Sequence, residues 1–177
     1  MDTQNSLRDG LLTVVLPAYN EQDSVPLAAD TICPLLEKEG IRHEILFVND
    51  GSRDGTWKAI QAQTARHPQV RGVCFSRNFG KEAAIFAGLA QAKGDCAVVL
   101  DCDLQHPPEK IVEMYRLWQQ GYQVVEGVKV TRGKESPLHT LAAKTFYHFI
   151  SSATKIDMSR ASDFKLLDRR AVDVLVA

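Results

Sequence analysis

Short apolar runs rich in β-branched residues alternate along the chain with stretches of helical periodicity. Near-continuous apolar runs are typical of strands buried on both faces, and their alternation with helices is typical of a mostly parallel sheet covered on both sides. We therefore predict an α/β fold of this kind. The predicted strands span residues 11–17, 44–50, 70–76, 96–101 and 123–130, and the predicted helices lie near 24–39, 55–67, 81–93 and 108–120.

Polar loops follow four of the five predicted strands. Open parallel sheets bind their ligands in the crevice outside the carboxyl ends of the strands. Because these ends meet at one edge of a sheet, we expect the four loops to form one site. The loops read PAYNE, NDGSRDGT, SRNFGKE and DCDLQHPP in chain order.

The loop DCDLQHPP carries two aspartates, Asp101 and Asp103, one residue apart. Side chains at i and i+2 of a strand end face the same way, and two unpaired carboxylates there would repel each other. Mg²⁺ and Mn²⁺ bind one or two protein carboxylates together with water and substrate phosphates, so the spacing favours a metal that bridges to a diphosphate. Alternatively, Asp103 begins a turn and Pro107 and Pro108 begin a helix. That alternative explains the prolines but not Asp101.

The loop NDGSRDGT has both ligand-binding and structural candidates. Asn49 and Asp50 suit hydrogen bonds to a nucleobase or a ribose. Ser52, Asp54 and Thr56 are good helix caps, so the loop also suits a purely structural role. The loop alone does not decide between them.

The two remaining loops offer an aromatic ring and charges. In PAYNE, Tyr19 provides a stacking face and Glu21 an acceptor, while the residues that follow suit a helix cap. In SRNFGKE, Arg77 and Lys81 bring positive charge to the edge that holds the aspartates or a phosphate. For Lys81 a solvated ion pair is an equal alternative.

Composition and charge narrow the function classes. The chain has 177 residues, 45% of them hydrophobic, which suffices for the core of one domain. Its formal net charge of −1 gives no overall attraction to nucleic acid, and we expect no nucleic-acid partner. Neither GxxxxGK[ST] nor GxGxxG occurs, which argues against the P-loop and dinucleotide-binding modes. The cysteines lack CxxC spacing and are expected to be reduced, buried residues.

The ends of the chain carry two expectations. The polar opening lacks the apolar region of a signal peptide, and we expect residues 1–10 to be a disordered tail. The helical pattern at the end is not closed by a cap, so we expect the natural protein to continue. No apolar run approaches the roughly 18 residues that a membrane span requires.

Four segments together resemble the inverting glycosyltransferases of family 2. They cover nearly the whole chain from Leu12 onward. The most similar branch glycosylates polyprenyl phosphates and includes dolichyl-phosphate mannose synthases and bactoprenol glucosyltransferases. The resemblance implies a GT-A catalytic domain over residues 11–177, followed by membrane-associated helices. The segments read VVLPAYNEQDSV, EILFVNDGSRDGT, RNFGKEAAIFAGLAQAKGDCAVVLDCDLQHPPE and DFKLLDRRAVD.

The resemblance also assigns roles to residues. Asp101 and Asp103 match the DxD pair that meets the metal, Mg²⁺ or Mn²⁺, and the diphosphate. Arg132 and Lys134 match basic residues that meet the acceptor phosphate. The predicted contacts to the nucleotide are Pro17, Tyr19, Glu21, Asn49, Asp50, Asp101 and Gln105.

Asp163 falls where the family places a carboxylate near the reacting centre. The alternative for this residue is a helix cap or an ion pair with Arg169 or Arg170. The predicted catalytic residues are Asp163, Asp103 and Arg132.

The implied reaction is the attack of a polyprenyl phosphate oxygen on the anomeric carbon of a nucleotide sugar, with inversion through an oxocarbenium-like transition state. UDP-sugars are favoured over GDP-sugars and UDP-glucose is the first choice, while UDP-N-acetylglucosamine and GDP-mannose stay open. One alternative is a family 2 transferase with a saccharide or polysaccharide acceptor. The other is a nucleotide-sugar-binding module that is inactive as this fragment.

Residues 138–153 carry an apolar stripe at helical spacing. Such a stripe can lie on a membrane surface, but core packing is its commoner meaning and is favoured for this chain alone. We expect the longer protein to act at the cytoplasmic face of the membrane in cell-envelope glycan synthesis, through regions absent here, and this fragment to be soluble. Whether the chain forms a homo-oligomer stays open.

Overall fold

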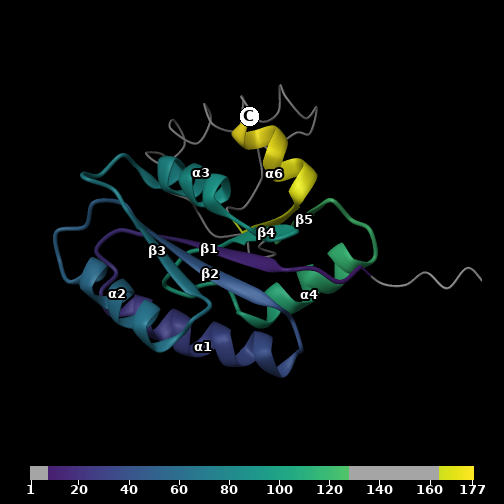
Figure 1. Cartoon of the computed structure of the whole chain (residues 1–177), viewed down its shortest axis with the longest axis horizontal. Helices are drawn as coiled ribbons and strands as arrows, with labels where there is room; N and C mark the ends of the chain where they lie inside the picture. Colours follow the sequence, from purple (N-terminus) through teal and green to yellow (C-terminus); the bar gives the residue numbers. More distant parts are fainter. Residues whose placement is uncertain (1–7, 128–163) are drawn as a thin grey trace, which may run out of the picture.

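A six-stranded sheet forms the centre of the chain in the computed structural model, which describes residues 8–127 and 164–177 (Figure 1). The strand order is β3-β2-β1-β4-β6-β5. Strands β1 to β4 pair in parallel, and β6 runs antiparallel to both of its neighbours. The prediction of an α/β fold with a mostly parallel sheet is confirmed. The strands are Leu12–Ala18 (β1), His43–Asn49 (β2), Val70–Cys74 (β3), Cys96–Val99 (β4), Val124–Glu126 (β5) and Lys165–Asp168 (β6).

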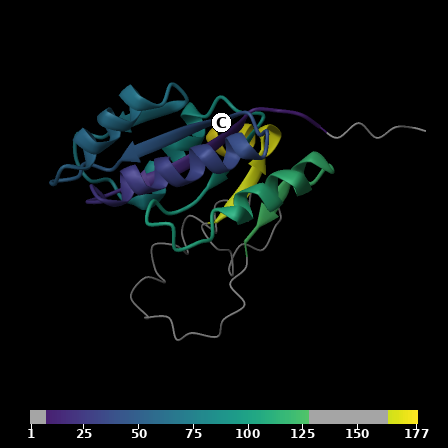
Figure 2. The ribbon, with the colours of Figure 1, turned by 90° about the horizontal axis from the view of Figure 1, so that it is seen from below.

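Helices cover both faces of this sheet. One face is covered by α1 (Ser24–Lys38), α2 (Thr56–Arg66) and α4 (Glu109–Gln119), and Figure 2 looks onto it from below. The other face is covered by α3 (Lys81–Gln91) and α6 (Arg169–Val176), which lie above the sheet in Figure 1. The predicted helical segments therefore match α1 to α4, apart from shifts of one or two residues at their ends.

The two-residue period of β1 divides the core between these faces. Leu12, Val14 and Leu16 are fully buried in the cluster that includes α1 and α4. Val15 points to the opposite face and packs with Ile85 of α3. Each such side chain contributes roughly 1.5–3 kcal/mol on burial, so both helical layers hold the strand in place.

The sequence did not predict β6 or α6, and the predicted ends of β3 and β4 lie two residues too late. Strand β4 ends at Val99, although the Leu100 N–H still donates to the Val15 carbonyl over 3.2 Å. Asp101 therefore lies just beyond the last backbone contact of the strand. Strand β3 ends at Cys74, and residues 128–130 of the predicted fifth strand lie outside the described residues.

A buried carboxylate ties the amino-terminal ends of the strands together. Glu44 of β2 is 6% exposed and accepts hydrogen bonds from the Thr13 hydroxyl, the Arg71 guanidinium and the Lys93 N–H, each over 2.7 Å. The Gly94 N–H donates in turn to the Thr13 hydroxyl over 2.9 Å. Burial alone would raise the pKa of Glu44, but these hydrogen bonds and the guanidinium outweigh it, so the pKa is lowered.

A second buried carboxylate, Asp168, joins the last strand and helix to the rest of the fold. It accepts from the Trp118 indole N–H over 2.8 Å and lies 3.3 Å from the Arg8 guanidinium. It also caps α6, because its carboxylate accepts from the Arg170 N–H over 3.0 Å. Residues 8–10 belong to this contact region, since the Tyr115 hydroxyl donates to the Gly10 carbonyl over 2.8 Å.

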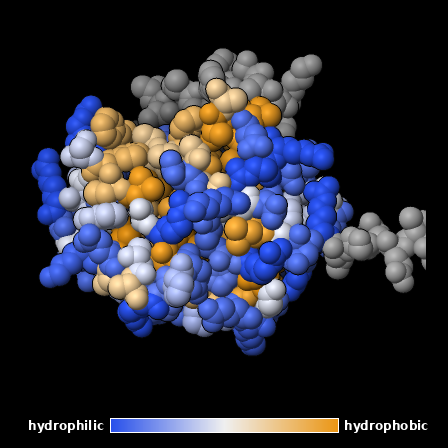
Figure 3. Space-filling view, viewed as in Figure 1, coloured by the Kyte–Doolittle hydropathy of each residue, from blue (hydrophilic) through white to orange (hydrophobic). Residues whose placement is uncertain are grey.

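Apolar side chains gather on the surface over α3 and α6 (Figure 3). They include Phe79, Phe86 and Val174, which are 51%, 44% and 56% exposed.

Within residues 8–127 and 164–177, no helix combines the length and the apolar character needed to cross a membrane.

Candidate active site

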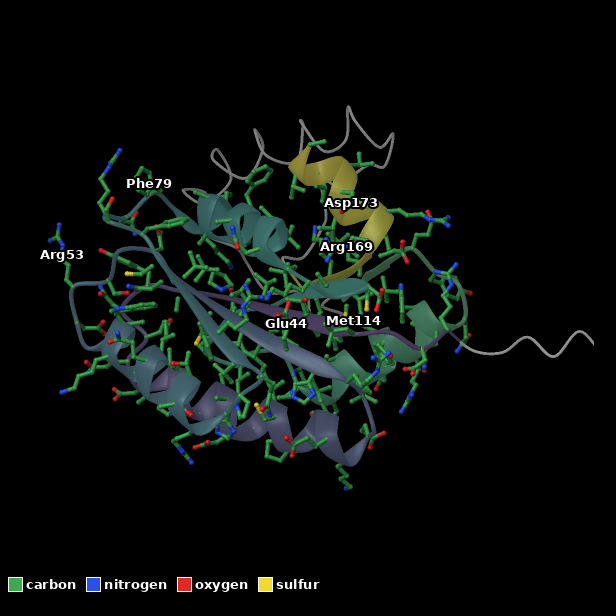
Figure 4. The ribbon with its side chains drawn as sticks, in the orientation of Figure 1. Glu44, Arg53, Phe79, Met114, Arg169 and Asp173 are labelled. Carbon is green, nitrogen blue, oxygen red and sulfur yellow. The ribbon has the colours of Figure 1, made fainter. Side chains whose placement is uncertain are left out.

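The loops after the parallel strands lie at one edge of the sheet. Strands β3, β2, β1 and β4 are direct neighbours in that order, so their carboxyl ends are adjacent. Arg53, from the loop after β2, and Phe79, from the loop after β3, lie at the same end of the molecule (Figure 4). This arrangement confirms the prediction that the four polar loops meet at one edge.

The loops after β1 and β2 are held together by hydrogen bonds between backbone and side chains. The Asn20 N–H donates to the Ser52 hydroxyl, and the Arg53 N–H donates to the Asn20 side-chain oxygen, both over 2.9 Å. The Glu21 N–H donates to the Thr56 hydroxyl over 2.8 Å. The two loops therefore form one rigid wall of the edge.

Asp54 supports the same wall at the start of α2. Its carboxylate accepts from the N–H and the hydroxyl of Thr56 and from the Gln22 N–H. Desolvation acts to raise the pKa of Asp54, but these hydrogen bonds together outweigh it, so the pKa is lowered. Ser52, Asp54 and Thr56 thus have structural roles in these loops, but the prediction of a helix cap is wrong, because the N-cap of α2 is Gly55 and it has no side-chain cap hydrogen bond.

Asp50 orders the loop that follows β3. The residue is 3% exposed, and its carboxylate oxygens accept from the Phe79 N–H over 2.7 Å and from the Gly80 N–H over 3.0 Å. Gly51 has φ +63°, and a Cβ there would lie 2.2 Å from the Arg77 carbonyl carbon. The sequence named Asp50 as a nucleoside contact but did not reveal this structural task. The sequence did contain one indication of this structural role: Asp50 stands at the end of a buried strand, directly before a glycine.

Asn49, which precedes Asp50 and is the last residue of β2, is also buried. It is 2% exposed, its amide nitrogen lies 3.1 Å from the Cys74 sulfur, and its oxygen accepts from the Ser52 N–H over 3.2 Å. Asn49 therefore links the ends of β2 and β3, and any contact of Asn49 or Asp50 with a nucleotide would be made from beneath the loops.

Asp101 and Asp103 lie on the exposed side of the loop after β4. The side chain of Asp101 is 35% exposed and Asp103 is exposed, while Cys102 between them is 2% exposed and packs in the core. The backbone turns sharply at Leu104, whose φ is +55°. The Gln105 N–H donates to Asp103 Oδ1 over 3.2 Å. Both carboxylates therefore keep oxygen atoms accessible at the site edge.

A positive charge accompanies this pair. The Lys81 ammonium, at the start of α3, lies 2.6 Å from Asp101 Oδ1. Burial raises the pKa of the Cys102 thiol, and the carboxylates of Glu21, Asp103 and Asp101 raise it further. Glu21 therefore adds to the negative charge around the two aspartates, and Lys81 offsets part of it.

These carboxylates suit a divalent cation that takes its other ligands from water and phosphate. Among the described residues, no group of three or more His, Cys, Asp and Glu side chains could hold a metal ion. These residues therefore do not form a site in which protein side chains alone coordinate a metal ion. Two accessible carboxylates fit the preferences of Mg²⁺ and Mn²⁺, which take few protein ligands and complete their coordination with water and phosphate oxygens.

Three further predicted nucleotide contacts belong to the loop after β1. Pro17 lies in β1 opposite Val48, and Tyr19 is 43% exposed. Glu21 accepts from the Ser24 hydroxyl over 2.5 Å. Tyr19 is thus the accessible ring on this wall, as a stacking contact requires.

Other predicted residues lie outside the described part of the chain. They are Arg132, Lys134, Asp163 and the segment 138–153. Arg169, one alternative partner of Asp163, donates to the carbonyls of Ala92 and Gly94 and pairs with Asp173 over 3.4 Å. The Arg170 N–H donates to Asp168.

A groove of about 350 Å³ lies between the end of the loop after β4, α4, β5 and Phe164. His106 stacks on Phe164 at its wall, with ring centroids 4.8 Å apart, and Met114 and Leu117 contribute apolar surface. No role for His106 could be predicted from the sequence, because a single histidine without ligand spacing carries no signal of its own.

Comparison of the sequence with known proteins gives consistent matches. The family model described as Glycosyl transferase family 2 matches residues 13–174. A bactoprenol glucosyl transferase of Shigella phage SfV is 37% identical over 164 residues, which cover 92% of this chain and 53% of that protein. The putative glycosyltransferase CsbB of Bacillus subtilis (strain 168) is 36% identical over 171 residues, or 96% of this chain and 52% of that protein. The chain thus spans about half the length of the curated relatives that it matches.

Solved structures share the fold. A mannosyltransferase from Pyrobaculum calidifontis, in complex with GDP-Man and Mn²⁺, superposes with a TM-score of 0.65 at 23% identity, covering 95% of this chain and 47% of that one. A glucosyl-3-phosphoglycerate synthase from Mycobacterium tuberculosis, in complex with Mn²⁺, UDP and glucosyl-3-phosphoglycerate, superposes with a TM-score of 0.62 at 24% identity, covering 90% of this chain and 57% of that one. Together with the strand order, these matches confirm the GT-A fold.

Proposed function

The chain belongs to glycosyl transferase family 2, and from this premise we propose that it transfers a glucosyl residue from UDP-glucose to a polyprenyl phosphate. The observation that carries the proposal is the pair of accessible carboxylates, Asp101 and Asp103, at the edge where four loops meet. The 37% identity to a bactoprenol glucosyl transferase supports glucose as the sugar and a polyprenyl lipid as the acceptor.

In this proposal the nucleoside binds against the wall formed by the loops after β1 and β2. The exposed ring of Tyr19 stacks on the base, and Pro17 and Glu21 line the same wall. The buried side chains of Asn49 and Asp50 present their remaining acceptor sites from the floor. The hydrogen bonds that lock these loops hold the wall in position before the nucleotide arrives, which reduces the ordering cost of binding.

The diphosphate then lies over the loop after β4. Asp101 and Asp103 would hold Mg²⁺ or Mn²⁺ there, and that cation would supply positive charge to the departing diphosphate. Gln105, whose N–H already orients Asp103, lies beside the same group. Two aspartates that stay accessible while Cys102 anchors the loop in the core provide a rigid support for this binding.

The chemical step is a single displacement. An oxygen of the polyprenyl phosphate forms a bond to the anomeric carbon of glucose while the bond from that carbon to the UDP oxygen breaks. The electron pair of the broken bond leaves with UDP, and the anomeric centre inverts. A phosphate monoester has a second pKa of about 6 and is largely ionised at neutral pH, so the acceptor needs no strong base.

The acceptor side of the proposal rests on residues outside the described ranges. Arg132 and Lys134 bind the phosphate of the acceptor, and Asp163 orients it near the reacting centre. Because the donor is a charged, water-soluble nucleotide sugar and the acceptor is a lipid, the transfer takes place at the cytoplasmic face of a membrane.

A transfer assay tests this function. The protein is incubated with UDP-[¹⁴C]glucose, Mn²⁺ and a polyprenyl phosphate in detergent, and the lipid fraction is counted. We expect labelled lipid that disappears with EDTA and in Asp103→Asn. GDP-[¹⁴C]mannose and a saccharide acceptor are run in parallel, and transfer only from mannose or only to the saccharide would contradict the proposed donor or acceptor.

A further inference from the structure

Lys81 occupies the first position of α3, where a positive side chain opposes the helix macrodipole. Its ammonium lies 2.6 Å from Asp101 Oδ1, and the two side chains are 39% and 35% exposed. The preferences of the helix itself therefore do not explain a lysine at this position. The contact between its ammonium and Asp101, one carboxylate of the DxD pair, does explain it.

Hydrogen bonds to the Asp50 carboxylate fix the backbone just before Lys81. Asp50 accepts the N–H groups of Phe79 and Gly80, and Gly80 has φ +101°, a conformation that side-chain-bearing residues rarely adopt. The Ala84 N–H then donates to the Gly80 carbonyl over 3.1 Å and begins the helix. The start of α3 is thus held firmly while the four-carbon stem of Lys81 extends to a half-exposed head group.

An ammonium and a divalent cation compete for the same carboxylate oxygen. With Lys81 in contact, Asp101 is already partly neutralised, so a cation that arrives alone must displace the ammonium and meets its repulsion. A nucleoside diphosphate changes this balance, because its oxygens offer the ammonium a new partner and offer the cation further ligands.

We propose that Lys81 is a counter-ion that competes with the divalent cation for Asp101, so that the cation binds together with the nucleotide diphosphate rather than before it. This inference rests on the proposed function, since it assumes that a diphosphate and a divalent cation share the site. It assigns Lys81 a positioning role: its ammonium leaves Asp101 for the diphosphate when the donor binds.

The test measures Mn²⁺ binding, without any transfer reaction. Electron paramagnetic resonance counts free Mn²⁺ in titrations of the wild type, Lys81→Met, Lys81→Gln and Lys81→Arg, each with and without UDP. Lys38→Met is the matched control, because it removes the same charge from the last turn of α1, at the opposite edge of the sheet. Thermal unfolding of each variant is recorded first, and the two neutral variants safeguard against one of them failing to fold.

Two shifts of opposite sign are expected from the neutral variants. A half-exposed ion pair is worth up to about 1 kcal/mol, so Lys81→Met and Lys81→Gln should bind Mn²⁺ alone about fivefold more tightly than the wild type. They should bind UDP in the presence of Mn²⁺ more weakly, because the diphosphate loses a charged contact. Lys81→Arg and Lys38→Met should follow the wild type in both titrations.

The opposite signs separate this role from a merely structural one, which would weaken both kinds of binding. If the wild type binds UDP in the presence of Mn²⁺ but the neutral variants bind Mn²⁺ alone no more tightly than the wild type, the counter-ion role is overturned. The proposed function is then unaffected. Absence of any Mn²⁺-dependent UDP binding in the wild type overturns both.

Discussion

At the residue scale, the carboxylate of Asp50 decides where the loop after β3 lies. It accepts two backbone N–H groups, from Phe79 and Gly80, in a position that is 3% exposed. A carboxylate that accepts backbone N–H groups makes charge-assisted hydrogen bonds, which are stronger than neutral ones. The position of α3, and with it that of Lys81, therefore depends on one buried side chain.

Asp50→Ala should lower the free energy of unfolding by about 1–3 kcal/mol, because it leaves the part-buried N–H groups of Phe79 and Gly80 without an acceptor. Urea unfolding followed by circular dichroism measures the change. Asp23→Ala is the control, since Asp23 is exposed and makes no side-chain cap hydrogen bond to α1, and its effect should stay within about 0.5 kcal/mol. Equal effects in both variants would show that Asp50 does not order the loop.

At the scale of elements, two buried carboxylates fasten the secondary structure. Glu44 joins β2 to β1 and β3 and also holds the turn between α3 and β4. Asp168 joins β6 to α4 and caps α6. Both lie at the edge of the sheet opposite the site loops, so stability and ligand binding are assigned to different ends of the same strands.

The contribution of Glu44 should depend on pH. Because its pKa is lower in the folded protein than in the unfolded chain, ionised Glu44 stabilises the fold above the unfolded pKa of about 4.3, and this stability is lost as the pH falls through the folded pKa. Glu44→Gln should therefore cost about 2–3 kcal/mol at pH 7, and less as the pH falls below about 4.

Urea unfolding of both proteins across this pH range measures the difference. Glu113→Gln serves as the control, because Glu113 pairs with Lys110 on the surface of α4 with both side chains more than half exposed. Its effect should stay below about 1 kcal/mol at every pH. A cost of Glu44→Gln that is the same at pH 7 and in acid would contradict the role of the ionised carboxylate.

Asp168 can be tested through its indole partner. Asp168→Ala removes the acceptor of the Trp118 N–H and the cap of α6, and should cost about 2–3 kcal/mol of unfolding free energy. Asp168→Asn keeps an acceptor oxygen and should cost less. A larger loss in the asparagine variant than in the alanine variant, measured by urea unfolding, would rule out the hydrogen-bond explanation.

The sequence reveals these elements unevenly. Strands β1 to β4 were recognisable because each is an apolar run followed by a helical pattern. Strand β6 is only four residues long and pairs with β4 across a separation of about 70 residues, so no local pattern marks it. Whether a polar residue binds a ligand or fixes a loop was equally undetermined, as Asp50 illustrates, because both tasks use the same carboxylate oxygens.

At the scale of the whole molecule, the parallel order of β3, β2, β1 and β4 brings together residues that are more than 80 positions apart in the sequence, such as Tyr19 and Asp103. This edge could be predicted because parallel strands place their carboxyl ends side by side. The sequence also placed Lys81 at this edge, near the aspartates or a phosphate. That its partner is Asp101 depends on the loop geometry set by Asp50 and is seen only in the structure.

The central claim is that Asp101 and Asp103 support the binding of a nucleoside diphosphate with a divalent cation. The most direct test is titration calorimetry of UDP into the protein, with Mn²⁺ and again with EDTA, for the wild type and Asp103→Asn. The control is Asp173→Asn, since Asp173 lies on α6, away from the loops that carry Arg53 and Phe79 (Figure 4). We predict UDP binding in the wild type and in Asp173→Asn that is lost with EDTA and weakened at least about tenfold in Asp103→Asn. UDP binding that survives both EDTA and Asp103→Asn would contradict the claim.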